Sequence, residues 1–230
     1  MTSLIAAAVV PAVFAVLAYR LDMVSKGGAV GGLVVAAAIY ATLGWQGFTI
    51  LALFVIAGSA LTRLGYVRKE RSGTAEGGGG RRGARNALAN SGVAVVCALL
   101  AALTAYPEAF AAAFVAALGA AFADTVESEV GQVYGVAPRL ITTFVKVPTG
   151  TDGAVSLPGT LAGAGAAGLT AFVGLAVGLV QSPGSALLVM VAAFLGTVVD
   201  SLIGAVAPRV GNELTNVSCT LVAAALTLLI

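Results

Sequence analysis

Carboxylates placed in or beside apolar segments are the residues of this chain with the clearest chemical potential. The sequence has ten Asp and Glu residues, and Asp124, Glu127 and Glu129 end one long apolar run while Asp200 lies near the end of another. An ionisable side chain in such a setting is energetically expensive and is therefore a candidate functional group. Carboxylate oxygens are the ligands that Mg²⁺ prefers. We expect Asp124, with Glu129 or Glu127, to hold Mg²⁺, and Asp200 to require a metal, an arginine or a proton.

The spacing of the first acidic cluster predicts how it is presented. On a helix Asp124, Glu127 and Ser128 share one side, at i, i+3 and i+4. Acids at a helix C-terminus oppose the helix dipole, so they need a compensating cation. A bound metal would supply that charge, and solvated acids paired with Arg139 or Lys146 are the alternative.

A loop rich in hydroxyls and glycines follows this cluster. Residues 149–153 read Thr-Gly-Thr-Asp-Gly, and Lys146 precedes them. Glycines let backbone N–H groups approach an anion closely. The loop lacks the GxxxxGK[ST] pattern of a Walker A motif, so nucleotide binding does not follow from this loop alone. We predict phosphate binding here, with ordinary turn formation as the alternative.

Amide side chains form two further polar groups with helical spacing. Asn86 and Asn90 are four residues apart at the start of an apolar run, and Asn212, Asn216 and Thr220 repeat the same spacing in another. Helix capping would explain one of the first pair. A buried hydrogen-bond seam between helices would explain the second group without any function.

The overall composition excludes most soluble classes of protein. Hydrophobic residues make up 59% of the chain and charged residues 10%, whereas a typical soluble domain is about 25% charged. There is no histidine, so histidine-dependent hydrolysis and histidine-ligated zinc are excluded. A nucleic-acid binder would need far more basic residues. We therefore expect an integral membrane protein with membrane lipids as its surroundings.

Cutting the chain at its polar interruptions predicts an all-α, polytopic membrane helix bundle forming a single domain, 1–230. A spanning helix needs about 20 apolar residues, and about eight transmembrane helices fit. The expected spans are 3–19, 28–44, 47–63, 87–106, 108–124, 159–180, 184–206 and 213–230.

The basic residues then predict the orientation of the bundle. All 12 Lys and Arg residues fall in connections on one side of the expected spans. Basic loops stay in the cytoplasm, so both termini should be on the non-cytoplasmic side. Residues 64–86 are expected to be a flexible basic cytoplasmic loop, acting either as an orientation signal or as a contact for substrate phosphate, and residues 131–158 a cytoplasmic active-site loop.

Several motifs together resemble a known family. They are Ala-Asp-Thr-x-x-Ser-Glu-x-Gly at 123–131, Pro-Arg-Leu-Ile-Thr-Thr at 138–143, Gly-Thr-Asp-Gly-x-Val-Ser at 150–156, Leu-Ala-Asn-Ser-Gly at 88–92, Val-Asp-Ser-Leu-Ile-Gly at 199–204 and Asn-x-x-x-Asn at 212–216. Taken together, and in their order along the chain from 86 to 220, they resemble the family of plant phytyl-phosphate kinase and its prokaryotic and animal membrane homologues. Val126 and Glu127 depart from the family pattern, which makes Asp124 and Glu129 the preferred acids.

The resemblance implies transfer of a phosphoryl group from a nucleoside triphosphate, with CTP as the expected donor, to an isoprenoid monophosphate such as phytyl, geranylgeranyl or polyprenyl phosphate. On this basis Mg²⁺ is the expected cofactor, with Asp124, Glu129 and Asp200 as ligands. Lys146 and Arg139 would neutralise phosphate charge. The remaining expected substrate and nucleotide contacts are Asn90, Ser128, Thr149, Gly150, Thr151, Asp152, Gly153, Ser156, Ser201, Asn212 and Asn216.

Other functions use the same residue types. A transporter for an anionic metabolite or lipid headgroup and a cytidylyltransferase that forms a CDP-linked lipid remain alternatives. For a lipid substrate, a lateral groove beside the Gly- and Ala-rich span 159–180 would admit the prenyl tail; Gly159 and Gly163 there have the small-xxx-small spacing that lets helices approach. The plasma membrane of a prokaryote is the expected location, and a homodimer is an open alternative.

Overall fold

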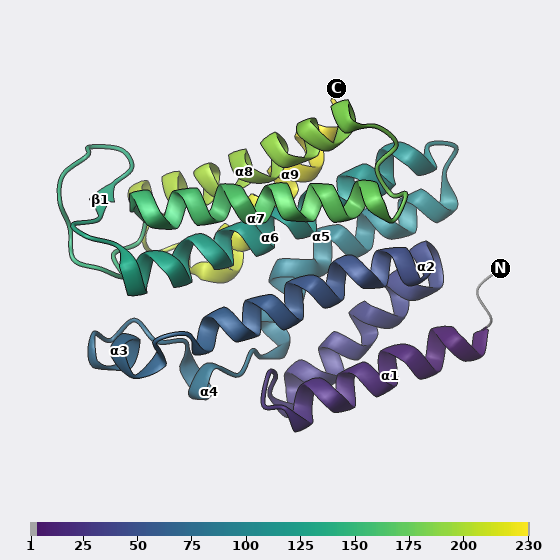
Figure 1. Cartoon of the computed structure of the whole chain (residues 1–230), viewed down its shortest axis with the longest axis horizontal. Coiled ribbons are helices and arrows are strands. Elements are labelled where there is room, and N and C mark those ends of the chain that lie inside the picture. Colours follow the sequence, from purple (N-terminus) through teal and green to yellow (C-terminus); the bar gives the residue numbers. More distant parts are fainter. Residues whose placement is uncertain (1–3, 230) are drawn as a thin grey trace.

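The computed structural model describes residues 4–229 and consists almost entirely of helices that run side by side (Figure 1). Polar loops and short elements gather at one end of the bundle, where β1, α3 and α4 lie. The elements are α1 (Leu4–Arg20), α2 (Lys26–Arg63), α3 (Tyr66–Arg71), α4 (Gly77–Gly80), α5 (Ala84–Leu103), α6 (Pro107–Tyr134), β1 (Arg139–Leu140), β2 (Ala154–Val155), α7 (Leu157–Ala176), α8 (Pro183–Val206) and α9 (Asn212–Leu228).

The long element α2 is a pair of antiparallel helices. Gly44 interrupts it with φ 65° and ψ −157°, a backbone conformation open to glycine. Gly28 and Gly58, one on each side of the break, both lie against Arg82. Thirty residues of straight helix would separate them by about 45 Å, so the chain reverses at Gly44. The turn expected between the second and third spans is therefore confirmed.

The fold is a polytopic helical membrane protein, as predicted. Five of the described helices, α2, α5, α6, α7 and α8, are long and apolar enough to cross a bilayer, and α1 is a shorter apolar helix. Large apolar side chains such as Leu161, Phe172 and Leu195 are exposed on the outer surface, where lipid would cover them. The number of spans and their orientation remain predictions. Residues 3 and 230, at the ends of the first and last expected spans, lie outside the described residues.

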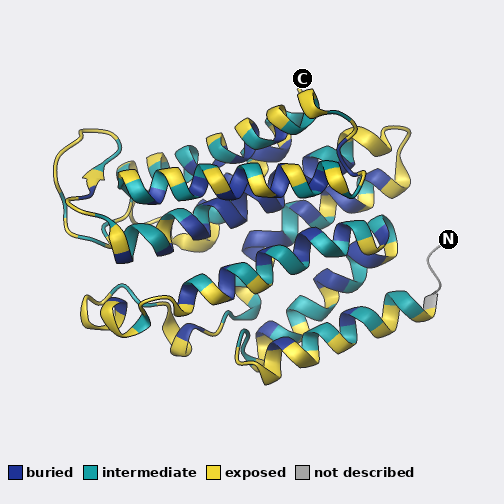
Figure 2. Cartoon of the chain, viewed as in Figure 1, coloured by how far each residue is buried: buried dark blue, intermediate teal, exposed yellow. Residues whose placement is uncertain are grey.

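Helix α6 forms the centre of the bundle. Its middle is a run of small and apolar residues, 113–118, with no exposed surface, and it packs against α5, α7, α8 and α9. In Figure 2 this helix is dark blue over its central turns, whereas the surrounding helices alternate between buried and exposed faces. Because α6 is enclosed by other helices, the acidic residues near its C-terminal end lie close to residues of several different elements.

The contact between α6 and α7 depends on the absence of side chains. A Cβ placed on Gly159 would lie 2.6 Å from the carbonyl oxygen of Glu127, and one on Gly163 would lie 3.1 Å from that of Ala123. The predicted close approach of helices at these two glycines is confirmed. It brings the start of α7 against the acidic end of α6.

Two loop boundaries differ from those expected. Residues 66–71 form the helix α3 inside the segment 64–86, which was expected to be a flexible loop, and the ion pair of the buried Lys69 with Glu129 joins this helix to α6. Helix α6 continues to Tyr134, which shortens the expected 131–158 loop to 135–156. The strands β1 and β2 pair antiparallel inside that loop.

Candidate functional site

A polar cavity of about 670 Å³ lies at the end of the bundle that carries α3, α4 and β1. It is enclosed by the first turns of α5 and α9, the last turns of α6 and α8, and the loops before α5 and α7. The predicted site residues that line it are Asn90, Asp124, Ser128, Glu129, Thr149, Gly150, Thr151, Asp152, Gly153, Ser156, Asp200, Ser201, Asn212 and Asn216. Motifs separated by more than 100 residues thus meet in one place.

Negative charge dominates this cavity. Seven of the ten acids of the chain line it, namely Glu76, Asp124, Glu127, Glu129, Asp152, Asp200 and Glu213. Among the described residues in its wall, Arg82 is the one cation. Carboxylates crowded in this way repel one another unless cations neutralise them. The cavity is therefore suited to bind cations, and a phosphate would bind there only with a cation that neutralises its charge.

Arg139 and Lys146 lie outside the cavity wall. They face each other in an isolated β-bridge within the 135–156 loop, and the Arg139 guanidinium donates to the carbonyl oxygen of Phe144 at 2.6 Å. Both side chains are exposed. The Arg139 guanidinium therefore stabilises this loop, and neither of the two cations expected at the phosphate lines the polar cavity.

Lys69 is a buried cation that the sequence analysis did not single out. It is 1% exposed, and its ammonium donates to a Glu129 carboxylate oxygen, to the carbonyl oxygen of Thr62 at 2.6 Å and to that of Leu61 at 3.3 Å. These three acceptors use all three ammonium donors. Glu129, expected as a metal ligand, is thus already paired, and Lys69 joins the C-terminal end of α2 to α6.

Arg82 is the second missed residue. Its Nη2 lies 3.4 Å from the hydroxyl oxygens of both Thr62 and Thr125, and its guanidinium carbon lies 5.3 Å from the centre of the Phe54 ring. Burial lowers the pKa of Arg82 from its usual value, and the carboxylates of Glu76, Glu129 and Asp124 oppose that shift. An arginine keeps its proton in proteins, so it brings a permanent positive charge to the acidic cavity.

Local sequence could not have distinguished these two cations. Lys69 and Arg82 belong to a basic segment that also holds Arg68, Arg71 and Arg81, each of which is exposed. Only contacts with Glu129 and Thr125, more than 40 residues away, set the two apart.

Asp124, Glu127 and Asp200 form the acidic centre. Asp200 and Glu127 both interact electrostatically with Asp124. Glu127 accepts a hydrogen bond from the hydroxyl of Thr160 at 2.8 Å. The Oδ2 atom of Asp200 is buried and has no hydrogen-bond partner within the described chain, which leaves one carboxylate oxygen free for a cation.

The donor set fits Mg²⁺ that is shared with a phosphorylated substrate. In the described part of the chain, no three acidic or cysteine side chains form a complete metal site. Mg²⁺ is usually held through one or two carboxylates plus substrate phosphates. Asp124 and Asp200 are the two carboxylates that would hold it, because the Glu129 carboxylate is already neutralised by the Lys69 ammonium.

The 149–153 loop is docked against α8 and against the 64–86 segment. A Cβ on Gly153, whose φ is +73°, would lie 2.3 Å from the backbone nitrogen of Ala205, and one on Gly150 would lie 2.4 Å from a Thr74 methyl. The Thr151 hydroxyl donates to the carbonyl oxygen of Pro148 at 2.8 Å. The loop is thus held between two walls of the cavity, with its backbone along the lining.

The remaining predicted polar residues line the cavity, and some of them also make hydrogen bonds that stabilise the helices. Ser156 caps α7 by accepting from the backbone N–H of Gly159 at 3.3 Å. Asn90, which is 2% exposed, donates to the backbone and side-chain oxygens of Asn86. Asn212 and Asn216 line the cavity from the first turns of α9.

A family model for the integral membrane protein DUF92 matches residues 9–224. The chain belongs to this family. It is 39% identical to an uncharacterized membrane protein, sll0875, of Synechocystis, over 82% of this chain and 75% of that protein. It is 38% identical to Protein VTE6, a chloroplastic protein of Arabidopsis thaliana, over 75% of this chain and 54% of VTE6. No solved structure matches the chain.

The relatives of this DUF92 protein extend to the archaea, with 30% identity to the uncharacterized membrane protein MJ0933 of Methanocaldococcus jannaschii over 85% of this chain and 80% of that protein. The family resemblance inferred from the motifs is thus confirmed. The structure adds that each of those motifs supplies at least one residue to the wall of one cavity, with Pro138 the one contribution of the 138–143 run and Asn90 that of the 88–92 motif.

Proposed function

We propose that this DUF92 protein is a membrane kinase that transfers the terminal phosphoryl group of a nucleoside triphosphate to an isoprenoid monophosphate, giving the diphosphate. CTP is the expected donor, with Mg²⁺ as cofactor. The observation that supports this most is the convergence of the acidic centre, the 149–153 loop and Arg82 in one cavity at the end of a lipid-embedded bundle. The relationship to VTE6 and the motif resemblance to the phytyl-phosphate kinase family point to the same class of reaction.

The proposed reaction needs no general base. A phosphomonoester has a second pKa near 6 and is mostly a dianion at neutral pH, so one of its oxygens attacks the terminal phosphorus directly. The bond between the terminal phosphorus and the oxygen that bridges it to the next phosphate then breaks, and the nucleoside diphosphate leaves with that bridging oxygen. A chain without histidine can carry out this step.

Repulsion between the two phosphorylated substrates is the main barrier, and the cavity residues would lower it. Mg²⁺ would supply charge neutralisation of the donor phosphates, held by Asp124 and Asp200. Arg82 would bind phosphate oxygens, while Thr149, Thr151 and the backbone of Gly150 and Gly153 would donate hydrogen bonds. Positioned charges of this kind stabilise a phosphoryl-transfer transition state.

The deciding experiment is an assay of purified protein in nanodiscs with Mg²⁺, each nucleoside triphosphate in turn, and geranylgeranyl or phytyl monophosphate. Nucleoside diphosphate and prenyl diphosphate should appear together. Pyrophosphate with a cytidylylated lipid would replace the kinase by the cytidylyltransferase. Binding of neither substrate would favour the transporter.

Two variants test the acidic centre. Asp124→Asn and Asp200→Asn should each lower turnover at least 100-fold, because each removes a ligand for the metal that stabilises the transition state. Asp22→Asn is the matched control, since Asp22 is exposed and pairs with Arg81 outside the cavity. Unchanged turnover in folded Asp124→Asn and Asp200→Asn proteins would contradict the assignment.

A further inference from the structure

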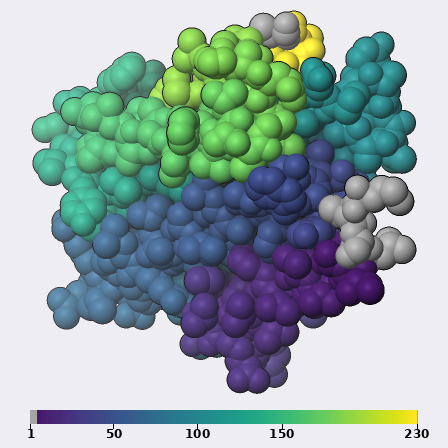
Figure 3. Space-filling view, turned by 45° about the vertical axis from the view of Figure 1, so that its right-hand side comes forward, coloured from purple at the N-terminus to yellow at the C-terminus, as the bar shows by residue number. Residues whose placement is uncertain are grey.

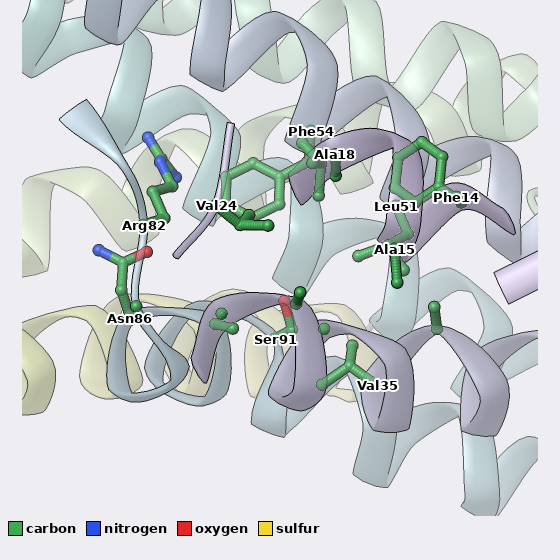
Figure 4. Close-up of a pocket in the computed structure, with 17 residues that line it drawn as sticks. Phe14, Ala15, Ala18, Val24, Val35, Leu51, Phe54, Arg82, Asn86 and Ser91 are labelled. Carbon is green, nitrogen blue, oxygen red and sulfur yellow. The ribbon is translucent and has the colours of Figure 1, made fainter. Parts of the chain in front are cut away.

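A second, apolar cavity adjoins the polar one. It encloses about 60 Å³ between α1, both arms of α2 and the start of α5. Its walls are apolar side chains and helix glycines, among them Phe14, Ala18, Val35, Leu51 and Phe54 (Figure 4). None of the residues that line it comes from α7, beside which a groove for a prenyl tail was expected from the sequence.

Arg82 and Asn86 line both cavities. In Figure 4 they stand at one end of the apolar cavity, while Phe14 and Leu51 stand at the other. The Arg82 guanidinium lies over the Phe54 ring, a wall of the apolar cavity, and reaches Thr125 in the polar one. The two spaces therefore meet at a fixed positive charge.

The Arg82 guanidinium retains donors for an anion. Its Nη2 makes the two long contacts to Thr62 and Thr125, and its other N–H groups donate no side-chain hydrogen bond within the described residues. Five N–H donors in a planar fork match phosphate oxygens well. A molecule with a phosphate head and an apolar chain would satisfy this charge and fill the apolar space at the same time.

We propose that the apolar cavity receives the first carbons of the hydrocarbon chain of the phosphorylated lipid, and that Arg82 binds its phosphate at the junction. This inference rests on the proposed function for the identity of that lipid. A volume of about 60 Å³ holds the first carbons of the hydrocarbon chain and not its whole length. Helix α1 lies at the edge of the molecule (Figure 3), so the rest of the hydrocarbon chain would extend past α1 into the bilayer.

Gly32 allows the cavity to be filled selectively. It lines the apolar cavity, and a Cβ added there meets no heavy atom within 4 Å. Gly165 on α7 is a matched control, because a Cβ there also meets nothing within 4 Å and the residue is exposed and lines neither cavity. Both substitutions replace a glycine inside a helix.

In the kinase assay, Gly32→Phe should raise the KM for the prenyl phosphate about tenfold, the loss expected when roughly two methylenes are no longer buried. The KM for the nucleotide should stay unchanged, and Gly165→Phe should alter neither constant. An unchanged prenyl-phosphate KM in folded Gly32→Phe protein, or a rise with Gly165→Phe instead, would overturn the proposal. If Gly32→Phe does not fold, Gly32→Leu is measured in the same way.

A photolabel separates failure of this site from failure of the kinase proposal. Wild-type protein in nanodiscs is irradiated with a prenyl phosphate whose first isoprene unit carries a diazirine, with and without unlabelled prenyl phosphate as competitor. Competed labelling of peptides from α1, α2 and α5 supports the site even in a protein without turnover. Labelling confined to α7 and α8, or no competed labelling, overturns it.

Discussion

At the scale of single residues, the Lys69–Glu129 ion pair raises the question of whether Glu129 stabilises the fold or binds a metal. Glu129 was, with Asp124, one of the two acids that the motif favoured as metal ligands, yet its carboxylate is buried against an ammonium that has no other acidic partner among the described residues. Lys69 also donates to two carbonyl groups in the last turn of α2, those of Leu61 and Thr62, where carbonyl groups lack the usual i+4 partner. The pair gives Glu129 a structural contact that the motif did not predict, beside the metal-binding role that the motif implied.

Breaking this pair from one side should destabilise the protein strongly. We expect Lys69→Met to lower the free energy of unfolding by about 3–5 kcal/mol, because the Glu129 carboxylate would be buried without a partner. The double variant Lys69→Met with Glu129→Leu should recover most of that loss. Thermal unfolding in detergent measures both.

Turnover of the double variant then decides the role of Glu129. A folded double variant that retains turnover would assign Glu129 to structure, whereas a stable but inactive one would return it to the metal site. Recovery of neither stability nor turnover would show that the pair is not simply replaceable by apolar residues.

At the scale of elements, the site depends on how closely α6 and α7 approach. The start of α7 packs on the backbone of Glu127, and Thr160 on its first turn holds the Glu127 carboxylate. Ser156 caps the same helix and follows directly on β2. Any separation of the two helices therefore moves both the acidic end of α6 and the 149–153 loop.

We expect Gly159→Ala to destabilise the protein by about 1–3 kcal/mol, the usual effect of overpacking a close contact. The added Cβ would lie 2.6 Å from the Glu127 carbonyl oxygen. Gly165→Ala adds the same methyl on the outer face of α7, where it meets nothing within 4 Å, and should be neutral or slightly stabilising. Equal unfolding temperatures for the two variants would argue against close packing at Gly159.

At the scale of the whole molecule, the arrangement of charge predicts the orientation in the membrane. The polar cavity, the 64–86 segment and the 135–156 loop share one end of the bundle, and Glu108 lies at the start of α6 near the other. If the basic end faces the cytoplasm, substrates must approach the cavity from that side. Nucleoside triphosphates are available there.

Cysteine labelling tests this orientation. The native Cys97 and Cys219 are both buried, so a membrane-impermeant maleimide should report introduced sites. In intact cells we expect Glu108→Cys to react and Ser72→Cys to react only after permeabilisation, because both positions are exposed at opposite ends of the bundle. The reverse pattern would invert the predicted topology.

The sequence by itself determined the membrane class and the helical fold, and it named part of the cavity wall. Long apolar runs can satisfy their backbone groups in lipid only as helices, and the motifs named 14 of the 29 described residues that line the polar cavity. Only the tertiary structure decided which cations reach the site. Arg139 and Lys146 are exposed and lie outside the cavity wall, whereas Lys69 is buried against Glu129 and Arg82 lines the cavity beside Thr125, because the partner of a side chain is set by packing between distant segments and not by local spacing.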